Sequence, residues 1–162
     1  ATITPKALSI SGLSSEDKVY DGTVTASVSG TASLATTIAA GSGTSDDGAA
    51  FTGDAVSLTG TAAGAFNDKD VADATTVSFS GLSLTGADAT NYTLTPHADA
   101  NHSITAKALT VTGSSAADRV YDATTDATIT VGTVSGFVGT ETVTATEGTS
   151  LASSARSAAE SS

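Results

Sequence analysis

The residues of this chain best suited to chemistry are aspartates gathered in one short stretch. Residues 66–73 read FNDKDVAD and include Asp68, Asp70 and Asp73. Hard cations such as Ca²⁺ are bound by several oxygens from carboxylates and backbone carbonyls. The stretch lacks the glycine and the distal glutamate of an EF-hand loop, so a solvated acidic loop is the alternative interpretation. The three aspartates therefore form a calcium hypothesis that the fold must support or weaken.

The other residue types used in catalysis give weaker signals. His97 and His102 lie in the sequence PHADANH, but a zinc site takes three or four ligands and the chain has no cysteine. A serine nucleophile needs a placed histidine and acid, and no G-x-S-x-G sequence is present. We therefore expect no enzymatic activity, no catalytic residues and no cofactor apart from the calcium considered above.

The charge of the chain argues against several kinds of partner. The net charge is −11, with 6 lysines and arginines in 162 residues. Nucleic-acid binders need clustered basic residues to neutralise phosphates, and anionic membrane surfaces attract the same residues. No run of residues approaches the ~18 apolar positions of a membrane span. We expect neither nucleic-acid binding nor membrane insertion.

Composition and apolar periodicity indicate the elements that must position these residues. Aromatic side chains make up only 4% of the chain, so the core must use small and β-branched residues, which suit sheets. Leu8 and Ile10 alternate with polar residues, as do Val77 and Phe79, and a period of two is typical of half-buried strands. Residues 32–41 and the Ala/Ser-rich tail are weak helix candidates. We predict an all-β fold of tandem small β-sandwich or β-grasp-like domains with at most one short helix.

The chain contains an internal repeat. Residues 3–23 read ITPKALSISGLSSEDKVYDGT and residues 104–124 read ITAKALTVTGSSAADRVYDAT, with 12 of 21 positions identical. Solenoid repeats have periods of ~20–50 residues. A period of 101 residues instead indicates separate small domains, each with its own core.

The most distinctive block in both copies is KVYDGT or RVYDAT. A tyrosine ring buries ~150–250 Å², which makes it a principal anchor in a core with few aromatic residues. The Asp-Gly pair is a turn signal, because aspartate bonds nearby backbone N–H groups and glycine tolerates positive φ. Ala123 tolerates positive φ poorly, so the second turn is either not left-handed or strained. We assign a structural role to Tyr20, Asp21, Gly22, Tyr121 and Asp122, with a binding loop led by Tyr20 as the alternative.

The order of these blocks resembles a known family. KVYDGT is followed by GDAVSLTG, AFNDKDV, VSFSGLSLTG and NYTLT, and then by ITAKALTV at the start of the second copy. This order resembles the YDG-type repeat domain, which is similar to the MBG family. The resemblance implies a mostly β, β-grasp-like domain that occurs in tandem in large secreted bacterial adhesins and filamentous-haemagglutinin-like surface proteins. It implies no catalytic residues. The chain departs from the family in an extra segment at 31–50 and in Ala123.

The repeat also sets the expected domain boundaries. Residues 1–105 should form one complete repeat, residues 106–149 a partial second repeat, and residues 150–162 an Ala/Ser-rich tail. A half-built sheet has open edges that invite pairing with another chain. The second repeat is therefore either a fragment cut within a domain or a unit completed by a neighbour. The expected partners are neighbouring repeats or identical subunits joined head to tail.

These observations lead to an expected function. We expect a secreted structural module at a bacterial cell surface, acting as an adhesin stalk or as a fibre subunit joined by strand complementation. The alternative is a module that binds a glycan or a protein. That alternative needs exposed aromatic side chains, and the chain has only three tyrosines and four phenylalanines.

Overall fold

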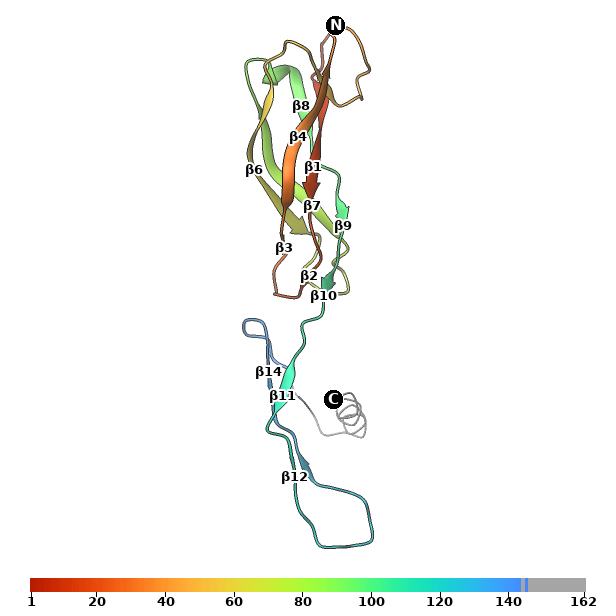
Figure 1. Ribbon diagram of the computed structural model, residues 1–162, viewed down its shortest axis with the longest axis vertical. Coiled ribbons are helices and arrows are strands. Elements are labelled where there is room, and N and C mark those ends of the chain that lie inside the picture. Colours follow the sequence, from red (N-terminus) through yellow and green to blue (C-terminus); the bar gives the residue numbers. More distant parts are fainter. Residues whose placement is uncertain (144, 146–162) are drawn as a thin grey trace. The chain divides into compact units, whose positions relative to one another are not determined.

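The computed structural model of the chain describes residues 1–143 and 145. The chain divides into two units, Ala1–Ala106 and Lys107–Ser162. Figure 1 shows that both units are built from strands. The Ala/Ser-rich tail expected at residues 150–162 lies outside the described residues. No helix in the described part of the chain is long and apolar enough to cross a membrane.

The first unit is a β-sandwich of two four-stranded sheets. One sheet has the order β5 (Ala49–Phe51), β4 (Ser29–Ile38), β1 (Lys6–Ser14) and β8 (Tyr92–Thr95). The other has the order β3 (Thr25–Ala26), β6 (Ser57–Phe66), β7 (Thr76–Thr85) and β9 (Ala100–Asn101). A separate small ladder joins β2 (Lys18–Val19) to β10 (Ile104–Thr105), and the 3₁₀ turn η1 spans Ala89–Asn91. The all-β prediction is confirmed, and residues 1–143 and 145 contain no α-helix of the kind that a β-grasp domain packs on its sheet.

One local prediction is wrong. Residues 32–41, a helix candidate, lie mostly within strand β4. This strand pairs antiparallel with β1 on one side and parallel with β5 on the other. Strand β4 ends in Thr36, Thr37 and Ile38, and β-branched side chains favour extended backbone. Two neighbouring strands that satisfy the backbone groups of β4 therefore outweigh the helix propensity of its alanines.

A bulge at a glycine lets side chains from both halves of strand β1 point into the core. Leu8 and Leu13 are 0% and 9% exposed, although residues five apart on a regular strand face opposite sides. The register of β1 against β4 shifts between Ser11 and Leu13, at Gly12, which has φ 87°. A side chain at Gly12 would meet the backbone carbonyl of Thr31. Thr31 and Ala32 of β4 stand against Gly12 alone, so β4 carries the extra residue of the bulge, and the left-handed backbone at Gly12 turns Leu13 back toward the interior.

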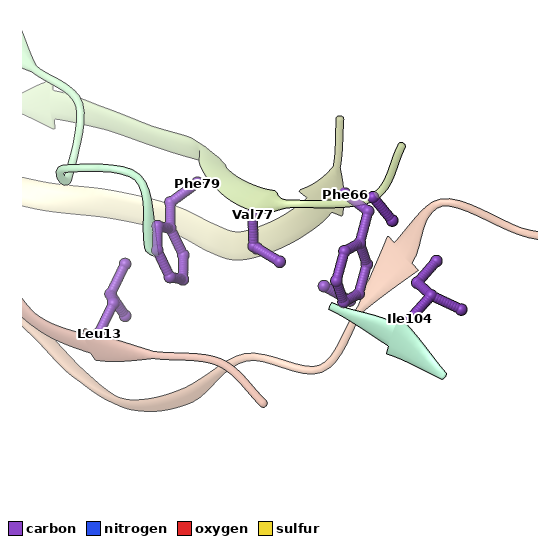
Figure 2. Packing of buried hydrophobic residues seen from close by; sticks show 7 residues of the cluster. Leu13, Phe66, Val77, Phe79 and Ile104 are labelled. Atoms are coloured by element: carbon purple, nitrogen blue, oxygen red, sulfur yellow. The ribbon is translucent and has the colours of Figure 1, made fainter. Parts of the chain in front are cut away.

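The core of the sandwich forms two clusters. The larger one contains Leu13, Ala26, Phe66, Ala74, Val77, Phe79 and Ile104. Figure 2 shows Ile104 beside Phe66, while Leu13 lies beside Phe79. The smaller cluster contains Leu8, Ala50 and Tyr92. The alternation that predicted strands at Leu8 and at Val77 therefore marks the inward faces of β1 and β7.

The second unit repeats the antiparallel pairing of β1 with β4 in the sandwich. Strand β11 (Thr110–Thr112) pairs with β14 (Thr133–Ser135), and β12 (Ser115–Ala116) pairs with β13 (Ile129–Thr130). Val111 lies opposite Val134, as Ile10 lies opposite Leu34 in the first unit. The second copy therefore pairs the counterparts of β1 and β4, but its two ladders keep one register throughout, whereas the register of the first unit shifts at Gly12.

Candidate functional site

The site with the most specific geometry is where β10 closes the first unit. Ile104 is 2% exposed and belongs to the larger core cluster. In the parallel ladder Ile104 lies opposite Lys18 and Thr105 lies opposite Val19. The backbone N–H of Tyr20 donates to the carbonyl of Thr105 at 2.8 Å, and that of Lys18 donates to the carbonyl of Ser103 at 3.2 Å. We call this arrangement, β2 with the core position filled by Ile104, the closing-strand site.

Asp17 fixes the residues that lead into β10. Its Oδ1 accepts a hydrogen bond from the backbone N–H of Ser103 at 2.8 Å and lies 3.2 Å from Nδ1 of His102. The bond from Ser103 and then the contact with His102 lower the pKa of Asp17 below its ordinary value. Sequence reasoning missed this role for Asp17 and His102. The two residues are 85 positions apart, so no local signal in the sequence links them.

The KVYDGT block forms a turn organised around a lysine. Nζ of Lys18 donates to Oδ1 of Asp21 at 2.8 Å, to the carbonyl of Thr23 at 2.7 Å and to the carbonyl of Thr25 at 2.9 Å. Oδ1 of Asp21 also accepts from the backbone N–H of Thr23 at 2.9 Å. Lys18 and then Thr23 lower the pKa of Asp21 to about 2. Gly22 has φ 78°, which glycine adopts without a steric cost.

The second copy forms the same turn with arginine in place of lysine. Nη1 of Arg119 donates to Oδ2 of Asp122 at 2.9 Å, and the backbone N–H of Thr124 donates to Oδ1 of Asp122 at 3.0 Å. The other guanidinium nitrogen donates to the carbonyl of Thr124. Ala123 has φ 62°, so this turn is left-handed at a residue that strains there. The hydrogen bonds of the turn are therefore local and recur in both copies.

The two tyrosines of the block differ in their surroundings. Tyr20 packs, partly buried, against the larger core cluster, whereas Tyr121 is 89% exposed. Leu109, the counterpart of the fully buried Leu8, is 39% exposed. The second unit exposes a set of large apolar side chains: Leu109, Val111, Val120, Tyr121, Ile129 and Val143. Sequence reasoning gave both tyrosines the same anchoring role, but burial of the ring is found only for Tyr20.

A second lysine–aspartate pair holds the extra segment against the sandwich. Nζ of Lys6 contacts Oδ1 of Asp47 and donates to the carbonyl of Ala49 at 2.6 Å. The carboxylate of Asp47 also accepts the backbone N–H groups of Ala49 at 2.9 Å and Thr44 at 2.8 Å. Lys6, then Ala49, lower the pKa of Asp47 to about 2. This loop aspartate is thus used to close a turn.

The three aspartates of the calcium hypothesis lie in the loop between β6 and β7. Oδ1 of Asp68 accepts the backbone N–H of Asp70 at 2.8 Å, and Oδ1 of Asp70 lies 2.6 Å from Nζ of Lys69. The carbonyl of Asp73 accepts from the side-chain amide of Asn67 at 2.8 Å. Within residues 1–143 and 145, no three acidic or histidine side chains gather closely enough to hold a metal ion. The structure therefore does not bring these carboxylates together, and the calcium hypothesis remains a prediction to be tested.

A comparison with protein families identifies the domain that is repeated in the sequence. Residues 4–100 and residues 105–161 each match the YDG domain. The chain belongs to the YDG domain family. No curated protein and no solved structure matches it. The bacterial adhesin setting that the sequence resemblance implies is taken up below as a proposal.

The YDG matches also locate the closing-strand site relative to the family boundary. The first match ends at residue 100 and the second begins at residue 105. Strand β10, Ile104–Thr105, therefore lies at the border between the matches, yet its isoleucine is in the core of the first unit. A YDG domain of this chain is thus completed by residues that the repeat assigns to the start of the next copy.

Proposed function

We propose that this chain is a structural repeat module of a bacterial extracellular surface protein, in which tandem YDG domains act as a stalk or spacer. Two matches to one family in 162 residues support a tandem arrangement. The net charge of −11 favours solubility of a long repetitive array through repulsion between copies. The proposed role is mechanical, because it requires the sandwich to stay folded while tension passes along the chain.

The pairing of the terminal strands is the observation that carries this proposal. β1, the first strand of the sandwich, runs parallel to β8, with Lys6 opposite Tyr92 and Ser9 opposite Thr95. β10, the last strand, runs parallel to β2. Pulling the two ends of the first unit apart moves parallel partners in opposite directions along their length. The load then falls on all the hydrogen bonds of a ladder at once, instead of opening them one after another.

Tyr92 adds a contact at the β1–β8 ladder. It is 6% exposed, and its hydroxyl accepts the backbone N–H of Phe51 at 3.0 Å and donates to Oδ2 of Asp54 at 2.6 Å. Burial, followed by the bond to Asp54, raises the pKa of the Tyr92 hydroxyl above its ordinary value. This side chain ties β8 to β5 at the far edge of the same sheet, which supports a load-bearing role for the sheet.

The cellular part of the proposal is tested by antibody labelling of cells that make the whole gene product. An antibody raised against the first unit should stain intact cells as strongly as permeabilised ones. Staining that requires permeabilisation would overturn the extracellular assignment. Cells whose gene product lacks the first unit are the control for antibody specificity, because the domain used to raise the antibody is then missing.

A fibre subunit joined by strand complementation is the second candidate, and the exposed apolar side chains of the second unit favour it. Val120 and Tyr121 are neighbours in the sequence and are each 89% exposed, and large exposed apolar side chains that lie together commonly mark an interaction site. Light scattering coupled to size-exclusion chromatography should then show oligomers whose mass rises with concentration. The double change Val120→Asp with Tyr121→Ser should return the chain to a monomer. A monomer at every concentration of the unchanged chain contradicts this candidate.

A module that binds a glycan or a protein is the remaining alternative. In the first unit the aromatic rings Phe66, Phe79 and Tyr92 are 3–6% exposed and are occupied by the core. Tyr121 is the aromatic residue whose exposure favours binding. Binding on a glycan array that is lost in Tyr121→Ser would support this alternative over the spacer.

A further inference from the structure

Two isoleucines that hold the same place in the repeat have opposite environments. Ile104 opens the second copy as ITAKAL and is 2% exposed. Ile3 opens the first copy as ITPKAL and is 98% exposed. Burying an apolar side chain of this size stabilises a fold relative to leaving it exposed. A repeat that places isoleucine at this position twice, and buries it once, indicates a partner for the other copy.

We propose that residues 1–4 are the closing strand of another YDG domain, one that precedes residue 1 in a tandem array. Ile3 would fill the core position of that domain and Thr4 would pair beside its β2, as Ile104 and Thr105 do in the first unit. The proposal deepens the spacer function and rests on it, because it names the surface by which successive domains join. Each domain of the array is then completed by the first residues of the next.

The acceptor is defined by the contacts that Ile104 and Thr105 make. The core position is apolar, and Figure 2 shows Ile104 directed to the same end of the cluster as Phe66. The backbone of β2 supplies N–H donors from Lys18 and Tyr20 to the incoming strand. The hydroxyl of Thr105 donates to the carbonyl of Lys18 at 3.2 Å. An acceptor of this kind recognises one aliphatic side chain, one hydroxyl and an extended backbone.

The residues at the N-terminus carry the groups that this acceptor uses. Ile3 and Thr4 reproduce the aliphatic side chain and the hydroxyl of Ile104 and Thr105. Thr2, in the place of Ser103, keeps the backbone N–H that Asp17 accepts in the first unit. Ala1 replaces His102, so only the imidazole contact with Asp17 is lost. The acceptor in the first unit is itself occupied by β10, which directs residues 1–4 to a different domain.

The experiment joins residues 1–101 directly before residue 1 of the full chain. In this tandem protein Ala1–Thr4 of the second segment falls where His102–Thr105 stands in the original sequence. The chain has no cysteine, so Ile3→Cys and Ile104→Cys each give one thiol for a labelling reagent. Three variants are compared: Ile3→Cys in the original chain, Ile104→Cys in the original chain, and Ile3→Cys at the junction of the tandem protein. Ile104→Cys gives the labelling rate of a thiol that is docked in the acceptor.

We expect the junction Ile3→Cys thiol to label at least about 100-fold more slowly than the same thiol in the original chain, because it reacts only when the added domain opens. The rate should approach that of Ile104→Cys. Equal rates for Ile3→Cys in the two proteins, with Ile104→Cys protected, overturn the proposal. In the original chain, the Ile3→Cys thiol could instead label more slowly as the protein concentration rises. That result also overturns the proposal, because it shows that residues 1–4 bind a second copy of the chain. A fast-labelling Ile104→Cys removes the acceptor and likewise overturns it.

A second measurement guards against poor docking of the cysteine itself. Ile3→Val at the junction should lower the melting temperature of the added domain only slightly, whereas Ile3→Ser should lower it much more. Equal melting temperatures for the two variants contradict the docking of Ile3. Labelling and melting report the junction without reference to load or to the cell surface. If the spacer function is wrong, the labelling and melting results are still valid. If the docking of Ile3 is wrong, the tests of the spacer function are unaffected.

Discussion

Ile104 lies opposite Lys18 in a parallel ladder, so residues that open the second repeat of the sequence close the first domain of the structure. The same isoleucine is 2% exposed among the core side chains of the sandwich. Stability of the first unit therefore depends on residues beyond the end of its family match at residue 100. The boundary of the folded unit therefore lies one strand, β10, beyond the point where the second copy begins in the sequence.

The first prediction compares the two equivalent isoleucines. Ile104→Ala should destabilise the first unit by about 2–4 kcal/mol, because it removes buried methyl groups and leaves a cavity. Ile3→Ala should change the stability by less than about 0.5 kcal/mol, because the side chain is 98% exposed. Urea unfolding followed by circular dichroism measures both. Equal effects of the two changes would show that β10 does not complete the core.

The second prediction concerns the left-handed residue of each YDG turn. Gly22→Ala should destabilise the first turn by about 1–2 kcal/mol, because a side chain at φ 78° crowds the backbone. Ala123→Gly should relieve the same strain in the second copy. Hydrogen exchange at the backbone amides of Thr23 and Thr124, which bond Asp21 and Asp122, should become faster in the first variant and slower in the second. Unchanged exchange in both would contradict the strain at Ala123.

The third prediction is loss of stability in acid. The pKa of Asp21, beside Lys18, and the pKa of Asp47, beside Lys6, are both lowered from 3.8 to about 2. The unfolded chain takes up protons on these carboxylates at a higher pH than the folded chain does, so stability rises with pH in this window. Their contribution is complete above the unfolded pKa and is lost as the pH falls through the folded pKa. The urea midpoint should therefore fall between about pH 4 and pH 2.

The controls for the acid prediction are Asp21→Asn and Asp47→Asn. Each variant should be less stable than the unchanged chain at neutral pH and should show a shallower fall of the urea midpoint in acid. Both carboxylates also accept backbone N–H groups, and the amide oxygen of asparagine retains part of that role. A pH dependence equal to that of the unchanged chain would exclude these two aspartates as its source.

The fourth prediction tests calcium at Asp68, Asp70 and Asp73. The carboxylate of Asp68 already accepts a backbone N–H and that of Asp70 already pairs with Lys69, so we expect no change in melting temperature between millimolar Ca²⁺ and a chelator. A rise in melting temperature with Ca²⁺ that disappears in Asp70→Asn would instead support the calcium hypothesis. Asp99→Asn, outside this loop, is the matched control for a general charge effect.

The sequence was informative where local chemistry decides the structure. Alternation placed Leu8 on the inward face of β1 and Val77 on that of β7, because a half-buried strand has a period of two. It failed at β4, where pairing on both sides overrides the propensity of an alanine-rich stretch. It also gave Tyr20 and Tyr121 one role, because two similar hexapeptides carry no information about which residues cover their tyrosines.

The closing-strand site was not predictable from the sequence for a related reason. Ile104 and Ile3 stand in nearly the same local sequence, and only tertiary pairing with β2 separates a buried residue from an exposed one. Asp17 and His102 meet across 85 residues for the same reason. Local patterns specify strands and turns, whereas the choice of partner strand depends on contacts that are distant in the sequence.

The most direct test of the spacer function is the force needed to unfold the first unit along two directions. Cysteine handles at Ala1 and Lys107 pull on the ends and load the β1–β8 ladder along its length. Handles at Ser57 and Thr85, which lie opposite one another at the open end of the β6–β7 hairpin, open that ladder bond by bond. Urea unfolding of both handle variants shows that their thermodynamic stabilities match. We expect a rupture force several-fold higher when the ends are pulled, and an equal or lower force through the ends would show that the first unit is not built to carry tension.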